Sequence, residues 1–342
     1  MPRVFYCLLL SMVLAACASA GETLRVLAWP GYVSTEAIRS FEARHNAKVE
    51  VSVINSDEEL WARAAGKKSE PFDLLAVNTA ELRRYVDARL VIPIRLKNIP
   101  NTRNQTQRFR KLDSIPGIVY QNEPYAVPYT YSAMGLIYNR KLVAKPPRSM
   151  SAMWDPRYQG KVLAYHGGAH NFSLTALMLG YRDPFKLNPT QFTQVVDQLR
   201  DLRKNVLKFY STPEEVVQLF RDNEVALVYA NYGDQQIQAL QRAGADIGYV
   251  IPQEGALAWL DCWAILSQTG NPALAEAWIN HMLTPEISGQ LTVREGLANT
   301  LRDTPKPSMP DTGKLVWIQP VEDAAQREFY WSRLLSSVAS RR

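Results

Sequence analysis

The sequence predicts an α/β protein with a parallel sheet, and two patterns lead to this fold class. Apolar runs of strand length alternate with helical segments along the chain, as in doubly wound parallel sheets. One run, residues 72–77 (FDLLAV), is apolar at almost every position, which is typical of a parallel strand covered on both faces. The chain has 342 residues, of which 46% are apolar, and this is ample for two lobes of ordinary size.

Local signals mark the first strands and helices. A turn at Pro30-Gly31 follows the first apolar run, and Ser34 or Thr35 can cap the next helix. We expect strands at 24–29, 49–54 and 72–77, and helices at 35–41, 57–65 and 79–87. Ligands of such sheets bind beyond the carboxyl ends of the strands. Residues 29–32 and 78–81 occupy two of these ends.

The rest of the chain continues the alternation without an internal repeat. We expect strands at 125–129, 134–139, 162–165, 206–210, 224–230, 247–251 and 259–266. We expect helices at 173–179, 190–202, 213–222, 272–283 and 285–291, and a last helix after the proline-rich tail that starts at Thr304.

Residues 1–20 read as an export signal. Arg3 precedes an apolar run, residues 4–16, that ends in small residues, which is the pattern of a secretory signal peptide. Two cleavage sites are consistent with it. The sequence ASA at 18–20 allows cleavage before Gly21, whereas LAAC at 14–17 resembles a lipobox, in which Cys17 is lipidated. We expect a periplasmic protein, attached to the membrane only if Cys17 carries the lipid anchor.

Cysteine usage and charge exclude several classes of protein. Cys7 and Cys17 lie in the leader, so Cys262 alone cannot form an internal disulfide. The net charge is +6, but the basic residues are scattered without interleaved aromatics, so nucleic-acid binding is not expected. The chain has four histidines, no G-x-S-x-G or phosphate loop, and Cys262 lies in an apolar run. We therefore expect no catalysis and no cofactor.

The order of several short motifs resembles a known family. Behind the leader they are WPGYV at 29–33, FDL at 72–74, VPY at 127–129, GLIYN at 135–139, WDP at 154–156, YQGK at 158–161, EVAL at 224–227, PQEG at 252–255 and WLD at 259–261. In this order the chain is similar, over essentially its whole mature length, to the bacterial periplasmic binding proteins for spermidine and putrescine, which serve ABC importers.

The resemblance implies a two-lobe type 2 periplasmic binding fold. Each lobe would be a mixed sheet flanked by helices, and crossover strands near 127–131 and 247–252 would join the lobes. Lobe 1 would comprise residues 22–128 plus 251–342, and lobe 2 residues 129–250. Such lobes close on a ligand by a hinge motion, and a membrane partner, an ABC permease or a membrane sensor, would recognise the closed monomer.

The family also suggests which residues hold an amine. An ammonium leaving water needs carboxylates for charge-assisted hydrogen bonds and aromatic faces for cation–π attraction. Trp29 and Tyr32 match one aromatic wall of the family's site. Trp259 and Asp261 match its aromatic-x-aspartate pair, in which the aspartate grips an amine. Asp234 falls at a second carboxylate of putrescine-type members.

Other positions depart from the family pattern. Asn231 replaces a tryptophan, Glu81 stands beside Ala80 where an aromatic residue is expected, and HGGAH at 166–170, which includes His170, replaces acidic residues. We also expect Tyr129 to line the cleft. Because these replacements make one end of the site less acidic than a spermidine pocket, we expect a shorter diamine, a polyamine held in another way, or an amine that also bears a carboxylate.

Several of these residues also have a purely structural interpretation. Trp29, Trp259 and Tyr129 could be packing aromatics, Asp261 could cap a turn, and Asp234 could be a helix N-cap. His166 and His170 have the i, i+4 spacing of metal ligands, but the glycines between them indicate a loop, so no metal is expected.

Two binding functions remain open on the sequence. The protein could deliver its ligand to an importer, or report the ligand to a membrane-bound enzyme of cyclic-di-GMP turnover, as some members of the family do.

Overall fold

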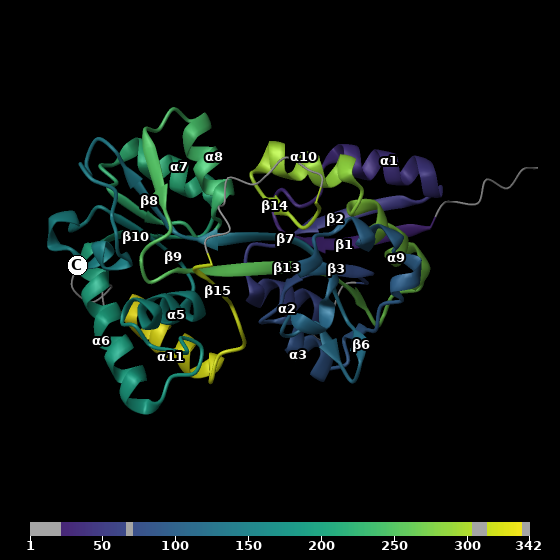
Figure 1. The fold of residues 1–342 in the computed structure, drawn as a ribbon, viewed down its shortest axis with the longest axis horizontal. Helices are drawn as coiled ribbons and strands as arrows, with labels where there is room; N and C mark the ends of the chain where they lie inside the picture. The colour runs from purple at the N-terminus through teal and green to yellow at the C-terminus, as the bar shows by residue number, and fades with distance from the viewer. Residues whose placement is uncertain (1–21, 66–70, 303–312, 337–342) are drawn as a thin grey trace, which may run out of the picture.

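The chain folds around two separate mixed sheets that lie side by side (Figure 1). A computed structural model describes residues 22–65, 71–302 and 313–336. The predicted leader and Cys17 lie outside these residues. The predicted α/β class with two mixed sheets is confirmed. Among the described residues, no helix is both long enough and apolar enough to cross a membrane.

The larger sheet has the strand order β14-β7-β13-β3-β1-β2, and β4 and β15 also pair with β13. Its strands are β1 (Thr23–Ala28), β2 (Lys48–Val53), β3 (Leu74–Asn78), β4 (Val91–Ile92), β7 (Val127–Met134), β13 (Ala256–Leu266), β14 (Ala298–Asn299) and β15 (Leu315–Trp317). Strand β1 is parallel to β2 and β3, whereas β13 runs antiparallel to β3 and β7. A long antiparallel strand therefore lies at the centre of this sheet.

The smaller sheet has the order β10-β9-β11-β8-β12. Its strands are β8 (Leu136–Asn139), β9 (Val162–Tyr165), β10 (Val206–Tyr210), β11 (Leu227–Tyr229) and β12 (Ile247–Val250). Strands β9, β10 and β11 are parallel, and β8 is antiparallel to β11 and β12. A separate hairpin pairs β5 (Val119–Tyr120) with β6 (Glu123–Pro124).

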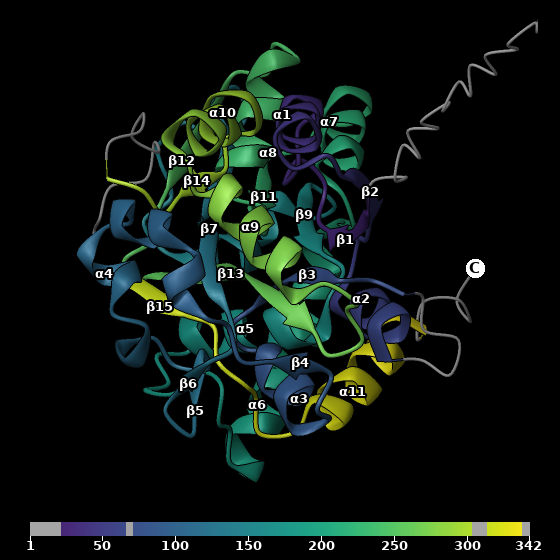
Figure 2. The same cartoon turned by 90° about the vertical axis from the view of Figure 1, so that its right-hand side faces the viewer.

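Helices cover the faces of both sheets (Figures 1 and 2). They are α1 (Thr35–His45), α2 (Asp57–Ala65), α3 (Leu82–Asp87), α4 (Gln107–Arg110), α5 (Gly168–Met178), α6 (Pro189–Asn205), α7 (Pro213–Asp222), α8 (Asp234–Arg242), α9 (Pro272–Met282), α10 (Pro285–Glu295) and α11 (Ala324–Ser336). On one face of the larger sheet, Trp263 packs edge-on against Trp278 of α9. On its other face, Cys262 is buried among residues that include Leu60 of α2 and Tyr85 of α3.

The first crossover between the two sheets passes through a glycine, Gly135, at a position with no room for a side chain. Gly135 separates β7 from β8, and a Cβ there would lie 2.6 Å from both the Tyr249 hydroxyl and the Val250 carbonyl oxygen. Tyr249 belongs to β12, which precedes the return crossover at 251–255, and its hydroxyl donates to the Ala133 carbonyl at 3.1 Å. A single tyrosine therefore ties the two crossovers together.

The C-terminal segment forms a third connection. Strand β15 pairs with β13 in the larger sheet, and α11 then packs beside α5 on the other half of the molecule (Figure 1). The Ile318 amide donates to Ala258 at 2.9 Å, and the Glu322 amide donates to Phe185 at 3.0 Å. Arg327 of α11 is fully buried and pairs with Glu322 at 2.7 Å. The predicted lobe limits stay a prediction, and the contacts of α11 bear on where lobe 1 ends.

Candidate functional site

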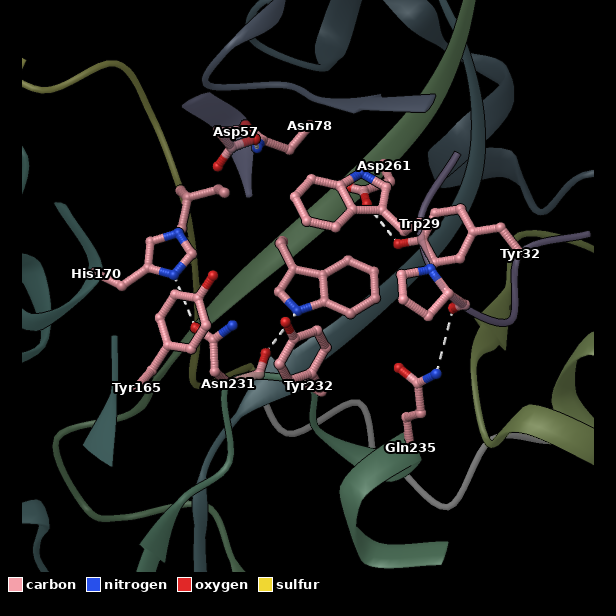
Figure 3. A pocket seen from close by; sticks show the side chains of 13 residues that line it. Trp29, Tyr32, Asp57, Asn78, Tyr165, His170, Asn231, Tyr232, Gln235 and Asp261 are labelled. Carbon is pink, nitrogen blue, oxygen red and sulfur yellow. Dashed lines mark hydrogen bonds between the residues drawn. The ribbon is translucent and has the colours of Figure 1, made fainter. Parts of the chain in front are cut away.

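A pocket opens between the two sheets, and about 490 Å³ of space that no atom fills, part of it open to solvent, lies within it. Figure 3 shows side chains from both halves of the molecule pointing toward it. It is lined by Trp29, Pro30, Tyr32, Asp57, Asn78, Tyr165, His170, Asn231, Tyr232, Gln235, Trp259, Asp261 and Ile318. Six of the residues predicted from the sequence are thus brought together: Trp29, Tyr32, His170, Asn231, Trp259 and Asp261.

Asp261 is a buried carboxylate on the central strand β13, and only 6% of the residue is exposed. Strand pairing sets it opposite Asn78 of β3 and Thr130 of β7. Burial raises the pKa of Asp261 to about 7, although the hydrogen bond from Tyr32 acts to lower it. The carboxylate accepts the hydroxyl of Tyr32, and no ion pair with an arginine of the described residues is seen, so the charged side chain gains a strong interaction when a cation arrives.

The Tyr32 hydroxyl donates a hydrogen bond to Oδ2 of Asp261 (Figure 3). Tyr32 lies in the turn region after β1, where the sequence TEAIR then begins α1 behind the Ser34 cap. Burial, and then the Asp261 carboxylate, raise the pKa of Tyr32 well above its usual value. The tyrosine therefore stays neutral and orients one oxygen of the carboxylate.

Two tryptophans form the aromatic walls. The Trp29 indole donates to the Ala76 carbonyl at 3.1 Å, and the Trp259 indole donates to the Asn231 carbonyl at 2.9 Å. Because each N–H is held by backbone, the rings are fixed, and a fixed ring face is suited to contact a cation or its methylenes. The Trp259 bond also joins the larger sheet to the loop after β11.

The opposite side of the pocket is uncharged. His170 and Asn231 share a hydrogen bond of 2.7 Å between Nδ1 and Oδ1. Burial lowers the pKa of His170, although this hydrogen bond opposes the effect, so the imidazole is neutral at physiological pH. The expected loop at 166–170 was wrong in part, because α5 begins at Gly168 and His170 lies in its first turn. Close packing favours a glycine at this position, since a Cβ on Gly168 would lie 3.0 Å from the Trp331 side chain.

Sequence reasoning missed Asp57, the second carboxylate of the pocket. Asp57 is the first residue of α2, and its Oδ1 accepts a hydrogen bond of 2.9 Å from Asn78. Burial, and next the nearby Glu81 and Glu58, raise the pKa of Asp57 well above its usual value. The strand-end rule pointed to residues 78–81, and therefore to Asn78, but no local pattern marked the start of α2 as a site.

Other lining residues were missed for a similar reason. Tyr165 ends β9, and Tyr232 follows β11, so both lie at carboxyl ends of strands in the smaller sheet. Gln235 donates from Nε2 to the Pro30 carbonyl at 3.3 Å and so links α8 to the turn after β1 (Figure 3). Applying the strand-end rule to the second half of the chain would have found the two tyrosines.

Three predicted residues do not line this pocket. Glu81 lines an adjoining pocket of about 850 Å³, which shares Asp57, Asn78, Tyr165, His170 and Ile318 with the first. Tyr129 is buried behind Tyr32, and its hydroxyl donates to the Tyr32 carbonyl at 2.9 Å. Asp234 is buried as the first residue of α8, next to the Gly233 N-cap. Their roles as ligand contacts stay predictions.

No group of three or more His, Cys, Asp or Glu side chains among the described residues has the arrangement of a metal site. His166 is exposed and makes an edge contact with Trp331, whereas His170 faces the pocket. Both histidines line the adjoining pocket, and only His170 also lines the first one.

Two sheets joined by crossover segments, with a polar and aromatic pocket between them, form the architecture of a two-lobe binding protein. Residues 36–300 match the family described as bacterial extracellular solute-binding protein. The chain belongs to this family. The resemblance seen in the sequence is confirmed.

Curated relatives share a moderate identity over most of the chain. The spermidine/putrescine-binding periplasmic protein of Escherichia coli K12 is 25% identical over 278 residues, which are 81% of this chain and 77% of the relative. The norspermidine sensor of Vibrio cholerae is 21% identical over 280 residues, which are 79% of this chain and 72% of the relative.

Solved structures share the fold. The Tp0655 (TpPotD) lipoprotein of Treponema pallidum superposes with a TM-score of 0.79 at 21% identity, covering 92% of this chain and 99% of that one. The periplasmic binding protein MotA of Agrobacterium tumefaciens, solved with glucopine, gives 0.73 at 16% identity, covering 91% and 99%. Proteins of this fold therefore include binders of different ligands.

Proposed function

We propose that this protein binds a polyamine or a related small amine between its lobes and delivers it to an ABC importer without chemical change. The observation that carries the proposal is the buried carboxylate of Asp261, set among Trp29, Tyr32 and Trp259. The names of curated relatives, which are spermidine- and putrescine-binding periplasmic proteins, point the same way.

The pocket can replace the water that an ammonium loses. Asp261 supplies a charge-assisted acceptor, and each tryptophan face adds a cation–π attraction of about 0.5–2 kcal/mol. The carboxylate is costly to ionise while the pocket is empty, because burial disfavours its charge. A bound cation removes that cost, so the site favours cations over neutral ligands of the same shape.

A binding protein that serves an importer works outside the cytoplasmic membrane, so it has to be exported. We propose export through the predicted leader, residues 1–20, with either cleavage after Ala20 or lipidation of Cys17. A monomer in the periplasm would then meet its permease in the ligand-loaded, closed form.

Calorimetry with the purified protein and putrescine or spermidine tests the proposal. We expect binding by the parent protein, and a loss of about 2 kcal/mol or more in Asp261→Asn, because this change leaves an ammonium without its charged partner. Asp197→Asn serves as the control, since Asp197 is exposed on α6 and pairs with Arg200. Equal affinity of Asp261→Asn and the parent for every amine would contradict the proposal.

The norspermidine sensor among the relatives supports a second candidate, in which the closed protein signals to a membrane enzyme. The two functions differ in transport. Deleting the gene abolishes uptake of a labelled amine if the protein serves an importer, and leaves uptake unchanged if it is a sensor.

A further inference from the structure

The pocket adjoins the second pocket, and five lining residues belong to both. The shared residues include Asp57, Asn78 and His170. Asp261 lies opposite Asn78 in the sheet, and the Asn78 amide donates to Asp57. The Cβ atoms of directly opposite residues in antiparallel strands lie about 4.5–5.5 Å apart. Asn78 therefore lies beside Asp261 in the sheet and contacts Asp57, where the two pockets meet.

We propose that Asp57 marks a second ammonium subsite, so that the ligand is a linear amine with at least two cationic groups, one near Asp261 and one near Asp57. This inference rests on the proposed function and specifies its ligand. The two carboxylates need not lie on opposite halves of the molecule. Asp261 is on strand β13 of the larger sheet, and Asp57 is on α2, a helix that packs against the same sheet.

The partners of Asp57 favour a cation there. Its carboxylate accepts one side-chain hydrogen bond among the described residues, the bond from Asn78, which is neutral. The adjoining pocket adds the carboxylates of Glu58, Glu81 and Glu328. Their mutual repulsion is relieved when a positive group enters.

Of the described residues that line the adjoining pocket, one carries a guanidinium, which is already engaged, and two are histidines, of which His166 is exposed. Arg84 pairs with Glu81 at 2.8 Å, donates to the Asp57 carbonyl at 2.8 Å, and stacks 4.6 Å from the centre of the Trp61 ring. Arg84 is the one Lys or Arg among the described residues that line the two pockets. His170 is neutral and bonded to Asn231.

These surroundings decide between the ligands that the sequence left open. An amine bearing a carboxylate would bring its negative end among carboxylates, and no free guanidinium or ammonium of the described lining would meet it. A diamine or longer polyamine would instead place a positive group at each acidic end. The replacement of acids at 166–170 therefore does not leave this end of the cavity without carboxylates.

A ligand series tests the inference on the parent protein. The probes are butylamine, putrescine and 4-aminobutanoate, which share a four-carbon chain and differ at the far end. Affinities are measured by calorimetry, with weak ligands measured by competition. We expect putrescine to bind at least about tenfold more tightly than butylamine, and 4-aminobutanoate to bind more weakly than butylamine.

Variants then locate the second group. Asp57→Asn keeps the shape and the acceptor for Asn78, and should reduce the putrescine-to-butylamine affinity ratio by about tenfold. Asp261→Asn should weaken both ligands. Glu59→Gln removes the same charge from the same helix outside both pockets, and should leave the ratio unchanged.

The outcomes separate the two proposals. If no amine binds the parent protein, the proposed function fails. If butylamine binds as tightly as putrescine, or 4-aminobutanoate binds best, amine binding stands and the second subsite is overturned. An unchanged ratio in Asp57→Asn, with a normal thermal melt, also overturns it.

Discussion

The hydroxyl of Tyr32 donates to the buried carboxylate of Asp261, and the two residues come from parts of the chain 229 positions apart. This hydrogen bond lowers the pKa of Asp261 against the larger opposing effect of burial. It therefore helps to keep the carboxylate in the charged form that an ammonium requires. Predictions about affinity and pH follow from this pair.

We expect Tyr32→Phe to weaken amine binding in a pH-dependent way. Without the donor, the pKa of Asp261 rises further above 7, so a larger share of the side chain is protonated near neutrality. The lost bond to a charged group costs about 1.5–3 kcal/mol. Calorimetry at several pH values should show a larger loss at pH 7 than at pH 9. A loss that does not depend on pH would assign Tyr32 a packing role only.

Asp261 should also make the unliganded protein less stable as the pH rises. Its pKa is raised from 3.8 to about 7 by folding, so the folded state holds a proton that the unfolded state has lost. The contribution is complete below about pH 4 and disappears progressively as the pH rises to 7. Linkage sets its size at about 4 kcal/mol at most.

The comparison with Asp261→Asn isolates this contribution from other groups. Denaturation of both proteins without ligand should show the variant gaining stability relative to the parent between pH 4 and pH 8. A parallel pH dependence for the two proteins would mean that Asp261 titrates normally in the folded state.

The Trp259 indole provides a test of lobe closure. Trp259→Phe keeps an aromatic face but loses the hydrogen bond to Asn231, a bond that joins the two halves. We expect amine affinity to fall by about 0.5–1.5 kcal/mol, and X-ray scattering to show a larger radius of gyration for the unliganded variant. An unchanged radius would indicate that other contacts hold the lobes together.

The crossover at Gly135 should not tolerate a side chain. In Gly135→Ala, the new Cβ would meet the Tyr249 hydroxyl and the Val250 backbone at 2.6 Å, and we expect a loss of about 1–3 kcal/mol in the free energy of unfolding. Gly270→Ala is the control, because no atom lies within 4 Å of its added Cβ. Chemical denaturation of both variants checks the difference.

Sequence patterns predicted most elements where the signal was local. The bounds of α2, β9, β10 and α7 agree with those observed, because apolar periodicity and nearby proline or acidic residues define them. Helix α8 was not predicted, and α5 starts earlier than expected. Helix α5 begins at Gly168 and α8 follows the Gly233 N-cap, and glycine is a weak helix former that gives no local signal of a helix start at either place.

The candidate site was predictable in part for the same reason. Trp29 belongs to a family motif that directly follows β1, and Trp259 and Asp261 belong to a motif within β13. Asp57 lines the pocket at the start of α2, where its hydrogen bond from Asn78 joins segments that are 21 residues apart. No pattern within the sequence brings such a pair together.

The C-terminal connection, residues 318–322, limits how far the two halves of the molecule can separate. Its two backbone anchors, Ile318 on the larger sheet and Glu322 against Phe185, are separated by only four residue steps. A fully extended chain covers about 3.3–3.6 Å per residue, so the anchors cannot separate by more than roughly 14 Å. Opening the two halves so far that these anchors move beyond this distance therefore requires breaking one of the two hydrogen bonds.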